Sequence, residues 1–157
     1  MIEEIYTYFT FEMIYLWLNF SVLPFWIMLI FFPNSKICKI FIVSIVPIII
    51  FTTIYIYLIY NIFNEGYDFL SNFDLYLGID QLKKLFSNTS FLILFWIHFL
   101  SINLFCGAWI VNDSQKFYIS KILISLPLII TYFIGPLGLL VYWIIRIFYA
   151  KRISFYN

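Results

Sequence analysis

The amino-acid sequence predicts an all-α fold, a polytopic membrane protein built as a bundle of four transmembrane helices. Hydrophobic residues make up 64% of the 157 residues and charged residues make up 11%. On a count that includes Gly and leaves out Tyr, the apolar share is roughly 59%, whereas soluble domains have about 45–50% apolar and about 25% charged residues. The apolar residues also gather in four long runs. A chain this short cannot bury such an excess in one core, so we expect residues 1–157 to form a single integral membrane domain in contact with lipid.

The four runs cover residues 11–32, 40–63, 91–111 and 122–145, and we expect the last helix to continue to residue 149. A helix needs about 20 apolar residues to cross a hydrocarbon layer of ~30 Å, and each run is that long. Within these runs the only charged residue is Glu12, in the first turn of the first. Many positions are β-branched or aromatic, but a segment in lipid must satisfy its backbone hydrogen bonds internally, which favours helix over strand.

For residues 64–90, between the second and third runs, the sequence predicts a further short helix in the stretch GIDQLKKLFSNTS. We expect Asp80 to cap this helix, because an aspartate oxygen can accept from the first free backbone amides. This helix would be amphipathic. Its apolar face carries Leu82, Leu85 and Phe86, and Lys83 and Lys84 lie beside that face. The pattern predicts an interfacial helix lying on the membrane, with an irregular loop as the alternative.

The fourth run contains the stretch IGPLG at residues 134–138, which predicts a kink or a break in the last helix. Pro136 removes a backbone donor, and glycine lowers the cost of a bend. A straight helix over residues 122–149 would be ~42 Å long, more than a bilayer needs. Gly135 and Gly138 also allow a neighbouring helix to approach closely, and we favour this close packing over a break that lines a ligand cavity.

The polar residues inside the runs are expected to share one half of the bundle. With four spans, the first and third helices enter from the same side, so Asn19 and His98 lie roughly 12 Å along their helices at ~1.5 Å per residue, and Asn103 lies a little deeper. Arg146 lies at the end of the last helix, on that same side of the membrane. Asp113 lies some 22 Å beyond His98 at ~1.5 Å per residue, so the two cannot form a direct acid–base pair on one helix. We expect Asp113 to be a helix-end or loop charge in contact with water.

The third run presents two stripes at helical spacing. One stripe comprises Trp96, Leu100, Asn103 and Gly107, and the other comprises His98, Ser101, Phe105 and Trp109. We expect both to face other helices, because an asparagine or histidine in contact with lipid would have no hydrogen-bond partner. Two roles stay open for these polar residues: bonding between helices, or membership of a functional site.

Several function classes are excluded by composition. The net charge is +1 and the nine basic residues are spread along the chain, so no basic face is available for nucleic acid. A single histidine and two cysteines, Cys38 and Cys106, fall short of a metal site or a disulfide framework. We identify no cofactor motif and no inverted repeat of the transporter kind. The absence of an Arg- and Ser-rich transit peptide leads us to expect a bacterial inner membrane.

The stretches FWIHFLSINLFCGAWIVND and SLPLIITYFIGPLGLLVYWIIR resemble the ABA-deficient-four-like family of small integral membrane proteins, whose plant members are needed for neoxanthin synthesis. The family pattern is similar to W-x-H-x-L-x-x-D-L-F-x-G-x-W-I, an Asp, L-P, G-P-x-G-x-L-x-Y and an Arg. It is matched at Trp96, His98, Leu100, Leu104, Phe105, Gly107, Trp109, Ile110, Asp113, Leu126, Pro127, Gly135, Pro136, Gly138, Leu140, Tyr142 and Arg146. The stretch WLNFSVLPFWIMLIFFP also resembles the family's opening helix.

Two positions depart from this pattern. Asn103 stands where the family usually carries an Asp, and Ala108 stands where it usually carries an Arg. Losing both members of an opposite-charge pair costs less than losing one, because a lone buried charge is the expensive state. We interpret the two departures as one compensated loss, which weakens any chemistry that used that carboxylate.

The resemblance implies a membrane protein that acts on or binds a carotenoid or a related isoprenoid. If it is an enzyme, an isomerase-type activity on carotenoids is implied, with His98 as the candidate catalytic acid and base, since histidine exchanges protons near neutral pH. The alternative is a non-catalytic scaffold, or a pigment- or lipid-binding protein that supports a partner enzyme. The candidate binding residues are Asn19, Trp96, Asn103, Trp109, Asp113, Gly135, Pro136, Gly138 and Arg146. Expected partners are membrane lipids, the isoprenoid, and a second copy or a partner enzyme.

Overall fold

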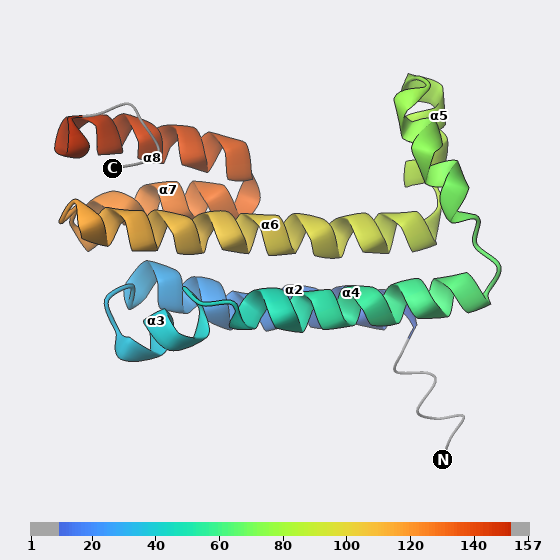
Figure 1. Cartoon of the computed structure of the whole chain (residues 1–157), viewed down its shortest axis with the longest axis horizontal. Helices are drawn as coiled ribbons and strands as arrows, with labels where there is room; N and C mark the ends of the chain where they lie inside the picture. The colour runs from blue at the N-terminus through green and yellow to red at the C-terminus, as the bar shows by residue number, and fades with distance from the viewer. Residues whose placement is uncertain (1–9, 152–157) are drawn as a thin grey trace, which may run out of the picture. The chain divides into compact units, whose positions relative to one another are not determined.

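Helices make up all the regular structure in residues 10–151, the part of the chain that the computed structural model describes. Three of them, α2 (Phe11–Phe31), α4 (Val46–Asn64) and α6 (Thr89–Lys116), are long and apolar enough to cross a membrane (Figure 1). No strand occurs among these described residues. The all-helical class predicted from the composition is therefore confirmed.

Large apolar side chains remain exposed on the outer faces of the long helices. On α2, Trp17 and Phe20 are 63% and 68% exposed, and on α4, Ile56 and Phe63 are 60% and 66% exposed. Such a helix in water would leave a large apolar surface unsatisfied, whereas lipid tails cover it without cost. The exposure agrees with a membrane environment.

The second run begins as a separate short helix, not as part of a continuous span from residue 40. Helix α3 (Lys36–Phe41) starts after Ser35, whose hydroxyl accepts from the backbone amide of Cys38 at 3.1 Å. Helix α4 then starts at Val46, whose backbone amide donates to the Ser44 hydroxyl at 3.2 Å. Pro47 lies in the first turn of α4, where its missing N–H costs nothing. The boundary therefore differs from the predicted one because these start signals fall inside the apolar run.

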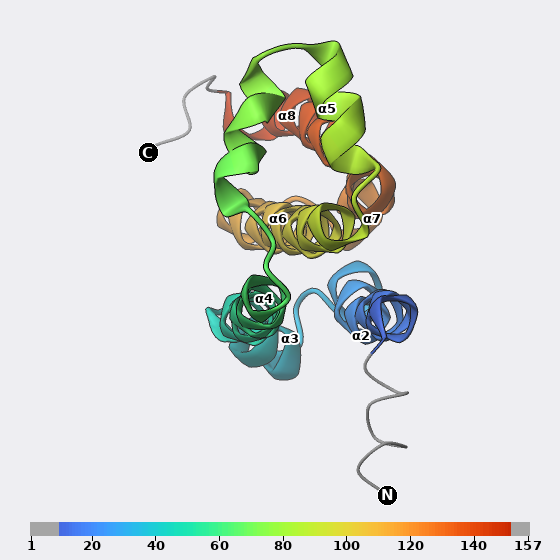
Figure 2. The same ribbon diagram turned by 90° about the vertical axis from the view of Figure 1, so that its right-hand side faces the viewer.

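The fourth run forms two helices, α7 (Lys121–Phe133) and α8 (Gly135–Ala150), of 13 and 16 residues. The predicted break is confirmed at Ile134, which is non-helical, with φ −140° and ψ 83°. The break reverses the chain, so that α8 runs back beside α7 as a helical hairpin (Figures 1 and 2). Each helix is shorter than the about 20 residues that cross a bilayer, so the expectation that this run forms a single span is wrong.

Close packing at Gly138 holds the hairpin together, as the glycine spacing predicted. A Cβ atom added to Gly138 would lie 2.6 Å from the Cα atom of Thr131 on α7. Both residues are buried, and the Thr131 hydroxyl donates to the Pro127 carbonyl at 2.7 Å. Only a residue without a Cβ lets the two backbones approach this closely.

Residues 65–88 contain two short helices, of which the sequence predicted the second. Helix η1 (Phe69–Tyr76) is a 3₁₀ helix whose N-cap is Asp68, and the Asp68 carboxylate accepts from the backbone amide of Leu70 at 2.9 Å. Just before it, the Tyr67 hydroxyl donates to Asn72 Oδ1 at 2.6 Å, and burial raises the pKa of Tyr67 above its ordinary value. The unexpected 3₁₀ helix follows from Asp68 acting as a capping residue.

Helix α5 (Ile79–Phe86) confirms the predicted amphipathic helix but not its cap. Its N-cap is Gly78, with φ +154°, a backbone conformation that glycine tolerates better than any other residue. Asp80 instead lies in the first turn, and its carboxylate forms an exposed ion pair with Lys83 at 3.4 Å. The helix begins earlier than expected because glycine supplies the required conformation without a side-chain cap.

Packing divides the chain into two compact units. Unit one contains the described residues up to Phe20 together with Ile49–Phe99, and unit two contains Ser21–Ile48 together with the described residues from Leu100 onward. The single membrane domain expected from the sequence stays a prediction.

Candidate functional site

Unit two contains a buried ion pair between α6 and α8. Arg146 Nε donates to Asp113 Oδ2 at 2.7 Å, and the Tyr142 hydroxyl donates to the same oxygen at 2.7 Å. All three residues are at most 4% exposed. Tyr142 and Arg146 lie four residues apart on α8, which places both side chains on one face of the helix.

The ion pair corrects two predictions. Asp113 was expected to contact water, and Arg146 was expected at the opposite end of the bundle from Asp113. Both side chains are instead buried and in contact with each other. The reason is the reversal at Ile134, which returns α8 along unit two and brings Arg146 to the last turns of α6. The expectation rested on a fourth span crossing in one direction, so the correction follows directly from the hairpin.

Aromatic rings enclose the Arg146 guanidinium. Its central carbon lies 4.7 Å from the ring centres of both Phe117 and Trp143. Trp109 packs edge-on against Tyr142, with 5.6 Å between the ring centres. Flat aromatic faces stabilise a cation that has been removed from water. The cluster therefore has the contacts of a structural clamp that joins the hairpin to α6.

Asn103 and Gly135 meet where the hairpin turns, as the close-approach prediction requires. A Cβ atom added to Gly135 would lie 3.2 Å from Asn103 Cγ. Asn103 is 4% exposed, and its Nδ2 finds no hydrogen-bond partner among the residues that the structure describes. A buried donor without an acceptor costs free energy. Pro136, next in the chain, is exposed in the first turn of α8.

The other predicted polar residues do not join this cluster. Asn19 Nδ2 donates to the Tyr15 carbonyl at 2.7 Å, a local bond one turn back along α2. His98 is exposed, so the expectation that its stripe packs entirely against other helices is wrong. Residues two apart differ by about 200° around a helix, and His98 therefore lies opposite Trp96 and Leu100, of which Leu100 is buried.

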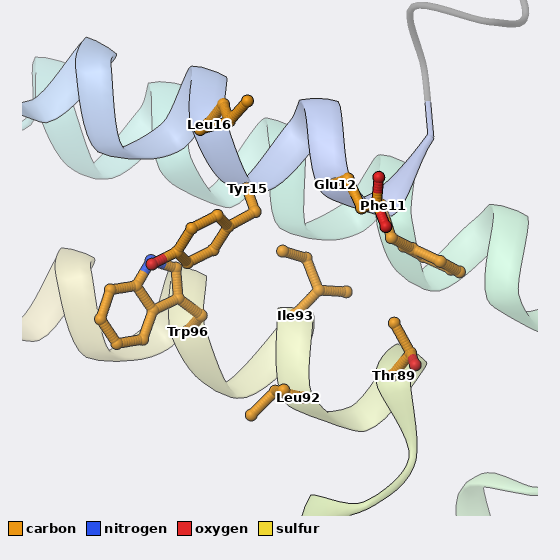
Figure 3. Close-up of a pocket in the computed structure, with 8 residues that line it drawn as sticks. All are labelled: Phe11, Glu12, Tyr15, Leu16, Thr89, Leu92, Ile93 and Trp96. Carbon is orange, nitrogen blue, oxygen red and sulfur yellow. The ribbon is translucent and has the colours of Figure 1, made fainter.

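A cleft of about 620 Å³ in unit one lies between the start of α2 and the start of α6 (Figure 3). Apolar side chains form most of its walls, with a few polar groups among them. The lining residues are Phe11, Glu12, Tyr15, Leu16, Thr89, Leu92, Ile93 and Trp96.

The polar groups of the cleft lie toward its two ends. Glu12 and Thr89 lie toward one end, and the Tyr15 and Trp96 rings lie toward the other, with 5.6 Å between the ring centres. The indole N–H of Trp96 is buried and has no acceptor among the described residues. Of the predicted site residues, only Trp96 lines this cleft. Glu12 could have been found from the sequence as a candidate site residue, because it is the only charged residue within the apolar runs.

A smaller cleft of about 300 Å³ lies in unit two, and Trp109 and Ala108 are among its lining residues. Val43, Ser44, Ile45 and Ile48 line its other side. Trp109 therefore belongs both to this cleft and to the packing around Tyr142.

A family model described as ABA DEFICIENT 4-like matches residues 13–142. The chain belongs to the ABA DEFICIENT 4-like family. It is also similar to "Protein ABA DEFICIENT 4, chloroplastic" of Arabidopsis thaliana, with 32% identity over 99 residues. This match covers 61% of the chain but only 44% of the Arabidopsis protein. No solved structure matches the chain.

Membership of the ABA DEFICIENT 4-like family confirms the resemblance seen in the sequence. The matched residues 13–142 include most of the lining of the first cleft and Asp113, Gly135 and Tyr142 of unit two. The name of the Arabidopsis relative places that protein in the chloroplast, which lends no support to our expectation of a bacterial inner membrane.

The two departures from the ABA DEFICIENT 4-like pattern fall in different surroundings. Asn103 is buried against Gly135, whereas Ala108 lines the smaller cleft. Residues five apart differ by about 140° around a helix, at about 100° per residue. The structure therefore does not support the interpretation of the two departures as one lost ion pair.

Proposed function

We propose that this protein is an integral membrane protein that binds a carotenoid or a related isoprenoid in the cleft between α2 and α6. The observation that carries the proposal is the cleft itself, an apolar space with polar groups toward its ends. Its volume of about 620 Å³ is in the range of small-molecule sites, about 300–1,000 Å³. Membership of the ABA DEFICIENT 4-like family supports this class of ligand.

The lining suits a long apolar molecule with an oxygen-bearing end. Leu16, Leu92 and Ile93 offer aliphatic surface, and the rings of Tyr15 and Trp96 offer flat faces to a conjugated chain. An oxygen of the ligand near Trp96 would supply the acceptor that the buried indole N–H lacks among the described residues. Glu12 and Thr89, toward the other end of the cleft, offer a second place where a hydroxyl group of the ligand can bond.

Binding fits the geometry better than catalysis by His98. An isomerisation needs an acid and a base beside the reacting atoms, and His98 is exposed and is not among the residues that line the cleft. The proton-exchanging groups that do line it are the Glu12 carboxylate and the Tyr15 hydroxyl. A carotenoid-modifying activity is therefore the second candidate, with Glu12 as the group to test beside His98.

Pigment content of the purified protein tests the proposal. The protein is produced in bacteria that accumulate a carotenoid, purified in detergent and extracted with solvent, and pigment is measured per mole of protein. We expect bound pigment in the native protein and at least a tenfold loss in Leu16→Trp, which fills the cleft. Leu23→Trp is the matched control, because Leu23 is also exposed on α2 but lies outside the cleft.

The same extracts separate binding from conversion and from a scaffold role. Unmodified pigment in the purified protein supports binding, whereas a new pigment in the cells supports an isomerase. Equal pigment in Leu16→Trp and Leu23→Trp would show that the cleft is not the binding site. Protein without any pigment, but with a second polypeptide retained through purification, would favour the scaffold alternative.

A further inference from the structure

We propose that η1 and α5 form an interfacial seat, a segment whose apolar face inserts into the lipid headgroup layer. The sequence predicted an interfacial position for α5 alone, and the face that carries this inference lies mainly on η1. The inference rests on the membrane placement in the proposed function, but not on the cleft or its ligand.

One face of η1 is apolar and turned outward. A 3₁₀ helix has three residues per turn, so residues three apart share a face. Leu70, Phe73 and Tyr76 form one such face and are 75%, 68% and 81% exposed. The spacing gives the helix a continuous apolar edge that no other described residue covers.

The two remaining faces of η1 have different surroundings. Phe69, Asn72 and Leu75 are half-buried and form the inner face, and Phe69 stacks on Phe63 of α4 with 6.4 Å between ring centres. The third face carries Asp74, which is exposed. Helix η1 is thus packed against α4 on its inner face, and its second face is polar. Its third face is apolar, and no described residue covers it.

The apolar edge continues beyond η1 toward α5. Leu77 and Ile79, on either side of Gly78, are 70% and 63% exposed. Helix α5 itself is anchored on its other side, because Phe86 packs against Phe95 of α6 with 4.8 Å between ring centres. Leu85 is buried beside it. The anchor keeps the exposed edge turned away from the packed side of unit one.

The connections hold this segment at the level where the long helices end. Only residues 65–68 separate α4 from η1, and only residues 87 and 88 separate α5 from α6. Both short helices run across the axes of α4 and α6 (Figures 1 and 2). A helix that is perpendicular to a spanning helix, and tied closely to its end, lies in the plane of the membrane surface.

The charges of the segment favour insertion by apolar side chains over attraction to anionic lipid. Acidic residues outnumber basic ones between residues 65 and 88, with Glu65, Asp68, Asp74 and Asp80 against Lys83 and Lys84. A basic segment would be attracted to anionic headgroups, whereas this segment carries a net negative charge. We therefore expect the seat to form equally well in vesicles of neutral phosphatidylcholine.

Site-specific fluorescence of the reconstituted protein tests the inference. Cys38 and Cys106 are the only cysteines, so Cys38→Ala and Cys106→Ala give a background in which one new cysteine carries an environment-sensitive label. The label is placed by Phe73→Cys on the apolar face, with Asp74→Cys on the polar face as the matched control. Ile56→Cys, exposed in the middle of α4, reports the membrane placement.

In phosphatidylcholine vesicles we expect blue-shifted emission for the label at residue 73 and at least twofold quenching by a lipid-bound quencher, with water-like emission for the label at residue 74. Adding anionic lipid should leave both signals unchanged. Water-like emission at residue 73, with lipid quenching at residue 56, overturns this inference alone. Water-like emission at residue 56 overturns the membrane placement and the inference together. Emission at residue 73 that is blue-shifted but not quenched by lipid would show a second polypeptide on this face and would also overturn it.

Discussion

Arg146 and Asp113 are 33 residues apart in the chain, yet their side chains form a buried ion pair with 2.7 Å between Nε and Oδ2. The pair joins the C-terminal hairpin to α6 within unit two, and Tyr142 adds a third group to it. Removal of one partner of such a buried pair strongly destabilises a protein, because the other charge stays buried without compensation.

Removal of one charge from this pair should therefore destabilise the protein. We expect Arg146→Met to lower the free energy of unfolding by about 3–5 kcal/mol, measured by denaturation with SDS in mixed micelles. The double variant Asp113→Leu with Arg146→Met should recover most of that loss, since no lone charge remains buried. Lys83→Ala, which breaks the exposed pair with Asp80, should cost less than about 1 kcal/mol. Equal losses in the single and double variants would contradict a paired role.

Gly138→Ala should open the hairpin. The added Cβ has no room beside the Thr131 backbone, and overpacking of a tight contact costs about 1–3 kcal/mol. Leu140→Ala, at an exposed position on the same helix, serves as the control and should have a smaller effect. The measurement is again the free energy of unfolding in mixed micelles, and a tolerated Gly138→Ala would mean that the hairpin contact is looser than the structure shows.

Replacement of Asn103 by an apolar residue should be tolerated, unlike the changes at Arg146 and Gly138. Its Nδ2 has no partner among the described residues, so Asn103→Leu removes an unsatisfied donor at similar side-chain size. We expect the stability of this variant to stay within about 1 kcal/mol of the native protein, because little hydrogen-bond energy is lost. Asn103→Asp should be less stable than either, since it buries a carboxylate without a cation in contact. If Asn103→Leu proves strongly destabilised, the amide has a partner that these contacts do not include.

Comparison of two variants decides whether Glu12 or His98 is the catalytic group. If the protein converts a carotenoid, Glu12→Gln should reduce the new pigment at least tenfold, because Glu12 lines the cleft. His98→Ala should leave the conversion unchanged, because His98 is exposed outside the cleft lining. Pigment analysis of whole cells gives both results, with protein amounts matched by immunoblot. Loss of conversion in His98→Ala alone would restore His98 as the catalytic residue.

The helical class and the position of the break were predictable because they depend on local features. Apolar runs of about 20 residues predict helices in lipid, and the Gly-Pro pair at residues 135 and 136 favours a break, because proline lacks a backbone donor. The helix at residues 79–86 was also predictable from its amphipathic pattern. The 3₁₀ helix before it was missed, since short 3₁₀ helices have no strong periodic signal and its start depends on the single cap at Asp68.

The candidate site was less predictable, since it depends on which faces meet. Trp96 was chosen for its stripe and does line the cleft, whereas Tyr15 and Thr89 line it from positions without a distinctive pattern. The cleft requires α2 and α6 to approach at their first turns, and hydrophobic periodicity gives no register between two helices. His98 was favoured because histidine exchanges protons near neutral pH, although this property says nothing about the direction of its side chain.

By itself the sequence determined the helical class, the lipid environment expected for it, the family and the break near Gly135, because each depends on residue type and spacing along the chain. Only the tertiary structure decided that the break reverses the chain, that Arg146 therefore reaches Asp113, and that a cleft forms beside Trp96 while His98 faces outward. The physical reason is that a break leaves the direction of the following helix free. Packing at Gly138 and the ion pair at Asp113 select one direction, and these contacts exist only between segments that are distant in the sequence.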